Sequence, residues 1–293
     1  MAELNTDSEG KKCAAACPHH DLYIYLLEGM VKKEDEFCLG NAFIGNWVEE
    51  GTSFLFFSKP SADALSQLLK MRPKLEVVED YHFAYEEWQG GGLKALKVDD
   101  FRIVPHWDRA AVDEKEIQII LDPGVVFGNG LHPTTRDCLR ALAFARKQKS
   151  FDRILDLGTG TGILAVAAAL LGAKKVLAID LNPLCVETAT ENVRLNDLNG
   201  IIQVVEGSAE DFVNEGVDLV IANIHKEIIG RLLQKEGFCE KDRLIISGLM
   251  RSQYREIKAQ VERYDFRIVQ EWDYDMTWFT MLAEKGETVC LKQ

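Results

Sequence analysis

Three alternate glycines, Gly158, Gly160 and Gly162, lie between a short apolar segment and the apolar stretch 163–171. Glycines at this spacing allow a sharp turn from a strand into a helix, and they leave bare backbone at the helix N-terminus against which a ligand can lie. Asp180 follows Gly158 by 22 residues, at the end of the next predicted strand, where its carboxylate can accept hydrogen bonds from a ribose diol. The pattern predicts a nucleotide site; the alternative is a tight turn beside a surface aspartate.

Asp156 places a second carboxylate in the same loop. It would repel the pyrophosphate of a dinucleotide, whereas it suits a ligand that carries an amino group and a sulfonium. We therefore expect S-adenosylmethionine rather than a dinucleotide as the cofactor. Its predicted contacts include Asp156, Gly158, Gly160, Gly162 and Asp180.

Asn223 ends the predicted strand 217–222, at the carboxyl edge where open α/β sheets bind ligands. An amide offers both a donor and an acceptor, so it can orient an amine without neutralising it. We interpret Asn223 as a residue that meets a ligand at this edge and can orient an amine. The alternative is that its side chain caps the helix that begins near Lys226.

A second unusual loop precedes the glycines: LDPGVVFGNGLHPTT, residues 121–135, has three glycines and two prolines within eleven residues. Thr134 or Thr135 can cap a helix over 136–146. Phe127 either covers an adenine or walls off the methyl donor, or it belongs to the core. Without further information the segment also fits an interdomain turn.

The elements that must hold these residues alternate regularly. Short strand-like segments alternate with helix-period stretches, which indicates a parallel sheet with helices on both faces. The chain then closes with a helix, a strand, a turn and a strand, which predicts an antiparallel hairpin at the sheet edge. The predicted strands are 154–156, 175–180, 202–205, 217–222, 243–248, 266–272 and 277–284, with the last helix at 251–263.

The first hundred residues have a different rhythm, with strand-like segments at 22–27, 54–57 and 101–104 and a helix at 62–70. They predict a small α+β domain, and the glycine run 90–92 marks a hinge or turn after it. We expect a flexible tail over 1–20, the small domain over 21–92, a lead-in over 93–120 and the catalytic domain over 121–293.

Composition narrows the class of protein. Of the 293 residues, 47% are hydrophobic, and the longest apolar run, 163–171, is too short to span a bilayer. Charges near the N-terminus argue against an export signal, so we expect a cytoplasmic protein. We also expect the protein to be a monomer. Seven cysteines, an odd number spread over the chain, suit reduced thiols.

The net charge is −13, and both parts of the chain are acidic: residues 1–99 contain 10 basic and 17 acidic side chains, and the rest contains 24 and 30. Neither part has the basic excess that neutralises phosphates, so direct DNA binding is not expected. A basic protein partner suits this charge better.

Cys13, Cys17, His19 and His20 form a cluster near the N-terminus. Because no second pair of ligands follows at the usual spacing, we predict no metal site there.

Several blocks together resemble the PrmA-type ribosomal protein methyltransferases, which modify a protein at the stalk base of the large ribosomal subunit. The blocks are FRIVPHW (101–107), LDPGVVFGNGLHPTT (121–135), ILDLGTGTGILAVAAALLGAKKVLAIDLNP (154–183), DLVIANI (218–224), LIISGL (244–249) and WFTMLAEKG (278–286). The chain departs from the family at Asn129, where threonine is usual, and at His225 and Lys226, where small apolar residues are usual.

The resemblance implies an α/β fold with a seven-stranded Rossmann-like S-adenosylmethionine-dependent methyltransferase domain preceded by a small α+β domain that recognises the substrate. It implies cofactor contacts at Thr135, Gly158, Asp180 and Asn223. The expected reaction is N-methylation of lysine or N-terminal amines of a large-subunit ribosomal protein. The alternatives are methylation of another protein's lysine or of a small molecule, and a non-catalytic module that binds the cofactor.

No general base is assigned. The sulfonium methyl is already activated, and desolvation can keep the amine neutral, so positioning by Asn223 and Phe127 is the expected contribution. His132 and His225 can each accept a proton, but a structural or exposed role is the more common one for such histidines.

Overall fold

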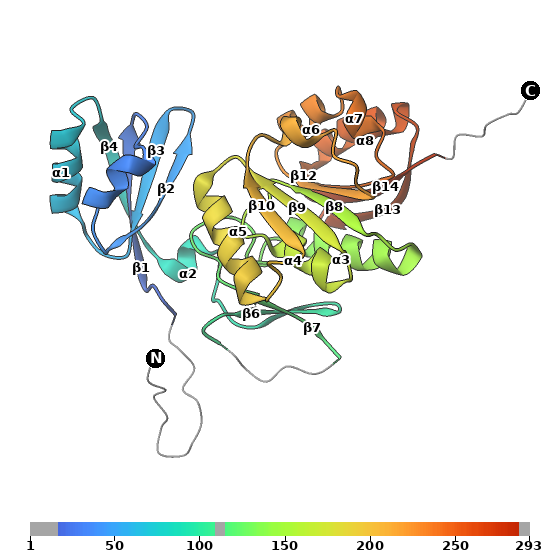
Figure 1. Cartoon of the computed structure of the whole chain (residues 1–293), viewed down its shortest axis with the longest axis horizontal. Coiled ribbons are helices and arrows are strands. Elements are labelled where there is room, and N and C mark those ends of the chain that lie inside the picture. Colours follow the sequence, from blue (N-terminus) through green and yellow to red (C-terminus); the bar gives the residue numbers. More distant parts are fainter. Residues whose placement is uncertain (1–16, 109–114, 287–293) are drawn as a thin grey trace, which may run out of the picture. The chain divides into compact units, whose positions relative to one another are not determined.

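The computed structural model describes residues 17–108 and 115–286, which form two compact units (Figure 1). The first unit extends to residue 96 and includes 102–118. The second comprises 97–101 and the chain from residue 119 onward.

The first unit is built around a four-stranded antiparallel sheet with strand order β2-β3-β1-β4. The helices lie between strands in a split βαβ arrangement, which confirms the small α+β domain. In chain order the elements are β1 (Asp21–Glu28), the 3-10 helix η1 (Lys33–Cys38), β2 (Phe43–Glu49), β3 (Thr52–Phe57), α1 (Ala62–Met71), β4 (Glu76–Ala84) and α2 (Tyr85–Trp88).

The core of this sheet forms because β1, β3 and α1 each present an apolar face. Leu27, Leu55 and Phe57 are buried together with Leu65 and Leu68 of the helix. Strands β2 and β4, which were not predicted from the sequence, are the two edge strands of this sheet. An edge strand buries little, so none of the β4 residues is buried and three of them are acidic, and β2 is interrupted by glycine and asparagine.

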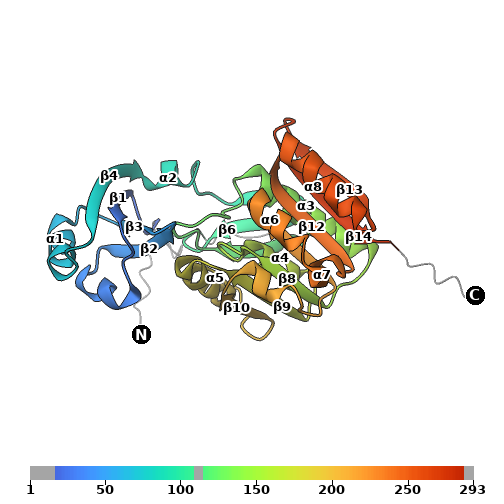
Figure 2. The same ribbon diagram turned by 90° about the horizontal axis from the view of Figure 1, so that it is seen from above.

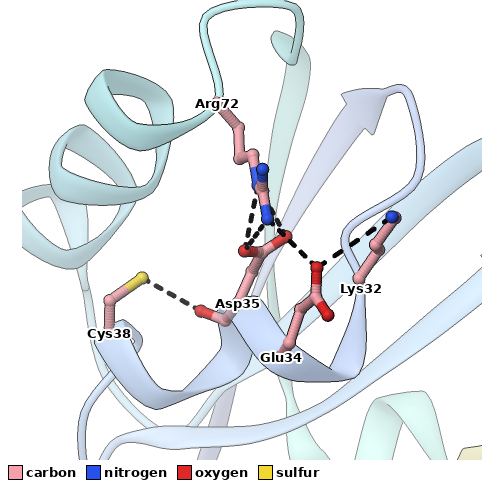
Figure 3. Close-up of polar contacts among 5 residues, drawn as sticks. All are labelled: Lys32, Glu34, Asp35, Cys38 and Arg72. Atoms are coloured by element: carbon pink, nitrogen blue, oxygen red, sulfur yellow. Dashed lines mark hydrogen bonds and ion pairs between the residues drawn. The ribbon is translucent and has the colours of Figure 1, made fainter.

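An ion pair joins η1 to the end of α1 (Figure 3). Asp35 is 2% exposed, and both of its carboxylate oxygens accept the single N–H of Arg72 Nε at 3.0 Å, while Arg72 Nη2 lies 2.8 Å from Oδ1. The same guanidinium reaches Glu34 at 3.2 Å, and the Cys38 thiol donates to the Asp35 carbonyl. The hydrogen bonds from Arg72 hold the pKa of Asp35 below its ordinary value.

Three further strands, β5 (Leu96–Val98), β6 (Phe101–Pro105) and β7 (Ile117–Leu121), form a separate sheet in that order. Only the strand at 101–104 was predicted from the sequence.

The second unit contains a seven-stranded sheet with the order β10-β9-β8-β11-β12-β14-β13, in which β14 runs antiparallel to both of its neighbours. This arrangement confirms the Rossmann-like methyltransferase fold class and the terminal hairpin. The strands are β8 (Arg153–Leu157), β9 (Lys175–Asp180), β10 (Ile202–Glu206), β11 (Leu219–Asn223), β12 (Arg243–Met250), β13 (Phe266–Tyr274) and β14 (Trp278–Lys285).

Helices cover both faces of this sheet. Figure 1 shows α3, α4 and α5 on one side and α6, α7 and α8 on the other. The predicted apolar stretch 163–171 forms α4, and every residue from Ile163 to Ala169 is buried, as expected for a helix that is apolar all round. No helix among the described residues is long and apolar enough to cross a membrane. The helices are α3 (Pro133–Gln148), α4 (Ile163–Leu170), α5 (Pro183–Leu195), α6 (Lys226–Leu232), α7 (Glu236–Cys239) and α8 (Arg251–Arg263), with the 3-10 helix η2 (Ala209–Phe212).

We predict that Arg72→Ala loosens the first unit, because it leaves the buried Asp35 carboxylate without its main partner. Hydrogen exchange at neutral pH should show lower protection of the η1 and α1 amides than in the wild type. Lys70→Ala, an exposed change in the same helix, is the control and should leave protection unchanged.

Because the pKa of Asp35 is depressed, the contribution of the pair is present at neutral pH and is lost as pH falls below about 4. Equal protection of the two variants at neutral pH would contradict the role of the pair.

Candidate functional site

The glycine loop joins β8 to α4 in a left-handed backbone conformation. Gly158 and Gly160 have φ of 69° and 55°. A Cβ at Gly158 would clash with Ile224 Cγ2, and one at Gly160 would clash with the carbonyl oxygen of Phe127. Glycine at these two positions therefore does more than form the turn. It also lets the end of β11 and the loop before α3 approach the glycine loop closely.

Asp180 lies at the carboxyl end of β9, as predicted, and holds the loop in place. Its Oδ2 accepts the Gly160 N–H at 2.9 Å, and its Oδ1 accepts the Asn182 N–H at 3.0 Å. Burial raises its pKa, and the backbone donors partly offset this effect. The Cys185 thiol and the Leu181 backbone also hydrogen-bond this carboxylate, which stands where open α/β sheets bind their ligands.

Asp156 lies beneath the loop and is fully buried. The Thr159 hydroxyl donates to Asp156 Oδ2 at 2.6 Å. Loss of solvation raises the pKa of Asp156 to about 7, and the negative charge of Asp180 adds to the rise. The carboxyl group is therefore poised between its two protonation states near neutral pH.

One buried amide joins the two loops. Asn192 of α5 is 0% exposed, and its side chain bonds both the N–H and the C=O of Asp122, at 2.7 and 2.8 Å, as well as the carbonyl of Thr161 at 2.8 Å. One turn further along the helix, Asn196 bonds the N–H and C=O of Ile120. These two asparagines supply the end of β7 with the backbone-like partners that an adjacent strand would otherwise provide.

Thr161 completes the connection from the glycine loop. Its N–H donates to the carbonyl of Phe127 at 3.0 Å, and its hydroxyl donates to the carbonyl of Gly128 at 2.7 Å. The Asn129 side chain closes a local turn onto Leu131 N–H, which explains how asparagine fits at this position of the loop. Segment 122–132 is therefore a fixed part of the site.

The start of α3 differs from the prediction. We expected Thr134 or Thr135 to cap a helix from residue 136, but the helix begins at Pro133 and the cap is His132, whose Nδ1 accepts the Thr134 N–H. A proline at the first helical position needs no hydrogen-bond partner, so the helix starts three residues earlier. The same Nδ1 lies 2.8 Å from the Thr134 hydroxyl, so both polar groups of Thr134 contact this ring nitrogen.

Thr135 is thereby free of the capping role. Its residue is 1% exposed, and its hydroxyl has no hydrogen-bond partner among the described residues. A buried hydroxyl without a partner is costly in a folded protein, which makes Thr135 a candidate ligand contact.

Asn223 does not cap α6, which removes the alternative that the sequence left open. The cap residue is the exposed His225, and it makes no side-chain capping bond. Asn223 pairs with Ser247 of β12 through the sheet, and a Cβ at Gly248 would lie 3.1 Å from Asn223 Oδ1. No side-chain hydrogen bond to Asn223 exists within the described chain, so its amide is available at the carboxyl edge.

An aromatic row stands beside this edge. The ring of Phe127 is 50% exposed, so it is not a core residue, and its centroid lies 5.2 Å from that of His132. The ring centroid of Trp278 lies 5.1 Å from that of His132. Burial lowers the pKa of His132, so the imidazole is neutral at neutral pH. Trp107 is buried, whereas Trp278 is only partly so.

Cys13 lies outside the described residues. Cys17 donates to the carbonyl of His19. Within the parts of the chain that the structure describes, no group of three or more His, Cys, Asp or Glu residues could hold a metal ion. The five described cysteines are free thiols.

The model of the family "Ribosomal protein L11 methyltransferase (PrmA)" matches residues 59–286. This match confirms the resemblance that the sequence motifs indicated. It also includes part of the first unit, from the end of β3 onward.

Two curated relatives are named ribosomal protein L11 methyltransferase. The protein from Anoxybacillus flavithermus is 38% identical over 212 residues, and that from Bacillus pumilus is 36% identical over 212 residues. Each alignment covers 68% of this chain, but the chain spans only 65% and 66% of these two relatives. A crystal structure of the ribosomal protein L11 methylase from Lactobacillus delbrueckii subsp. bulgaricus superimposes with a TM-score of 0.59 at 30% identity, covering 66% of this chain and 99% of that one.

Replacing the joining amide tests the connection between the two loops. Asn192→Ala leaves the Asp122 and Thr161 backbone groups without partners, and we expect it to lower the free energy of unfolding by about 2 to 4 kcal/mol. Chemical denaturation of the purified chain measures this change. Asn199→Ala, an exposed asparagine just past the same helix, should change stability by less than about 0.5 kcal/mol. Similar losses in both variants would contradict a special role for Asn192.

The buried Asp156 predicts a pH dependence of stability. Its pKa is raised in the folded state, so between about 4 and 7 the folded chain holds a proton that the unfolded chain has released, and stability falls as pH rises through this window. From pH 5 to 8 the loss is about 3 kcal/mol. Asp156→Asn keeps an acceptor for Thr159 and should remove this part of the slope. Denaturation at both pH values measures it, and an identical slope in the variant would show that Asp156 is not responsible.

Proposed function

Because the chain belongs to the ribosomal protein L11 methyltransferase (PrmA) family, we propose that it transfers methyl groups from S-adenosylmethionine to lysine or N-terminal amines of ribosomal protein L11. The observation that carries the proposal is the convergence of the glycine loop, Asp180 and Asn223 at the carboxyl edge of a methyltransferase sheet. That edge is where open α/β folds bind their ligands.

The residues present suit S-adenosylmethionine. Asp180 places a carboxylate at the end of β9, where it can meet the ribose hydroxyls, and the buried Thr135 hydroxyl lacks a partner within the described residues. Ionised Asp156 would favour a cationic ligand from below the loop. Gly158, Gly160 and Gly162 keep the backbone of the loop free of side chains. When bound, the cofactor supplies a methyl group already activated by the sulfonium.

The protein's own contribution is to hold a neutral amine in line. At pH 7 the neutral form of a lysine with pKa near 10.4 costs about 4 to 5 kcal/mol, and burial in an apolar site lowers that cost. The Asn223 carbonyl oxygen can accept an N–H of the amine. This hydrogen bond orients the amine so that the lone pair of its nitrogen faces the methyl group. Phe127 covers the site and excludes water.

His132 is a poor general base in this arrangement. Its Nδ1 already accepts the Thr134 N–H, and burial lowers its pKa. The reaction is therefore left without an assigned base, as the chemistry of an activated methyl group allows.

The charge of the chain supports a basic protein as the substrate. The net charge is −13, and the first unit, for which we propose substrate recognition, is acidic like the rest. Complementary charge speeds encounter and disfavours partners of the same sign.

The test is methyl transfer from labelled S-adenosylmethionine to purified ribosomal protein L11, with the modified amines located by mass spectrometry. We expect Asp180→Ala to weaken cofactor binding by at least about tenfold, because hydrogen bonds to a carboxylate contribute roughly 1.5 to 3 kcal/mol each. Asn223→Ala should lower kcat by about a hundredfold, a larger effect than on cofactor affinity.

Asp242→Ala is the matched control, because this exposed aspartate lies at the start of β12, at the opposite edge of the sheet. It should leave both quantities unchanged. Label on another protein with none on L11 would overturn the substrate assignment. Tight cofactor binding without transfer to any acceptor in a cell lysate would overturn the enzyme assignment.

A further inference from the structure

Large exposed side chains gather at the tip of the hairpin formed by β13 and β14 in the second unit. Met250, Tyr274 and Met276 are each about half exposed, at 48%, 48% and 53%. Trp278 lies between two of them, because it is the cross-strand partner of Met250 on β12 and of Tyr274 on β13. We call these four residues the hairpin-tip surface. Methionine and aromatic residues are the types enriched in protein interfaces.

The turn at the tip is built at a conformational cost. Thr277 N–H donates to the Tyr274 carbonyl at 2.9 Å, and the two residues between them, Asp275 and Met276, both have positive φ, of 48° and 56°. Two left-handed residues make a type I′ turn, which favours Asn-Gly or Asp-Gly. Folding alone would prefer glycine at position 276. The chain instead carries a long apolar side chain there and exposes it to solvent.

The hairpin-tip surface lies beside the proposed transfer site. Strand β12 continues three residues past Ser247, the partner of Asn223, and reaches Met250 beyond the end of β11. Trp278 then contacts His132, which contacts Phe127, so the aromatic row connects the two regions. Figure 2 shows β13 and β14 beside β12 and α8 at one end of the sheet.

The charge around the tip is negative. Asp273 and Asp275 flank Tyr274, and neither forms an ion pair with the described residues, while Arg251 follows Met250. Asp273 accepts the Met276 N–H within the turn. An apolar surface with an acidic border matches a segment in which an apolar side chain lies close to basic residues.

We infer that the hairpin-tip surface binds the segment of the protein substrate next to the target amine, and so sets which amines reach Asn223. The inference rests on the proposed function. Its occupant is an apolar side chain of the substrate, held against Met276 and Tyr274 while a neighbouring lysine enters the site. Burial of exposed apolar area against a partner supplies the affinity.

The test separates substrate binding from folding. Met276→Gly converts the turn to Asp-Gly, so we expect a higher unfolding midpoint together with a KM for ribosomal protein L11 raised by about five- to tenfold. Tyr274→Ala should raise KM to a similar extent. In both variants kcat should stay within about twofold and the Kd for S-adenosylmethionine should not change, because neither side chain is part of the cofactor site.

Tyr264→Ala is the matched control, because Tyr264 is 40% exposed in the same unit but follows α8, at the opposite edge of the sheet. It should leave KM unchanged. An unchanged KM in both hairpin variants, or an equal rise in Tyr264→Ala, would overturn the inference while leaving the proposed function intact. Failure of the wild-type chain to methylate L11 would overturn the proposed function and this inference with it.

Discussion

The arrangement of the site depends on Asn192, a single uncharged amide buried on α5. Its side chain bonds Asp122 on one side and Thr161 on the other, and Thr161 in turn bonds the carbonyls of Phe127 and Gly128. Backbone groups removed from water need partners, and no strand of the described residues pairs with these segments to provide them. The amide therefore supplies the hydrogen bonds that a neighbouring strand would otherwise provide. It holds the segment 122–132 and the glycine loop, which are far apart in sequence, against one another.

This fixed frame allows the chemistry to be divided among residues with different surroundings. Asp180 is held at the rim by backbone donors, whereas Asp156 is buried beneath the loop with a pKa of about 7. His132 is committed to a helix cap and is kept neutral by burial. Asn223 keeps its amide free at the sheet edge. The reaction that we propose needs orientation and exclusion of water more than proton transfer, and the arrangement matches that requirement.

The two units differ in how their sheets are stabilised. The second unit has a central, fully apolar helix and parallel strands buried on both faces, so its sequence alternates clearly between strand and helix patterns. The first unit has an exposed edge strand, β4, and uses the Arg72–Asp35 pair to hold η1 against α1. The weaker patterns of its strands follow from this lower burial, which is why β2 and β4 were not predicted.

The sequence by itself determined the fold class, the glycine loop, the acid at the end of β9 and the family, because these depend on local spacing and on hydrophobic periodicity. Only the tertiary structure decided which polar residues are buried. Asn192 and Asn196 look like ordinary helix-surface residues in sequence, His132 replaced the expected threonine cap, and Phe127 proved exposed. The hairpin-tip surface likewise emerges only from strand pairing, which brings Met250 and Trp278 together across 28 positions of the chain. Hydrogen-bond partners and exposure depend on contacts between distant segments, and local sequence patterns do not encode those contacts.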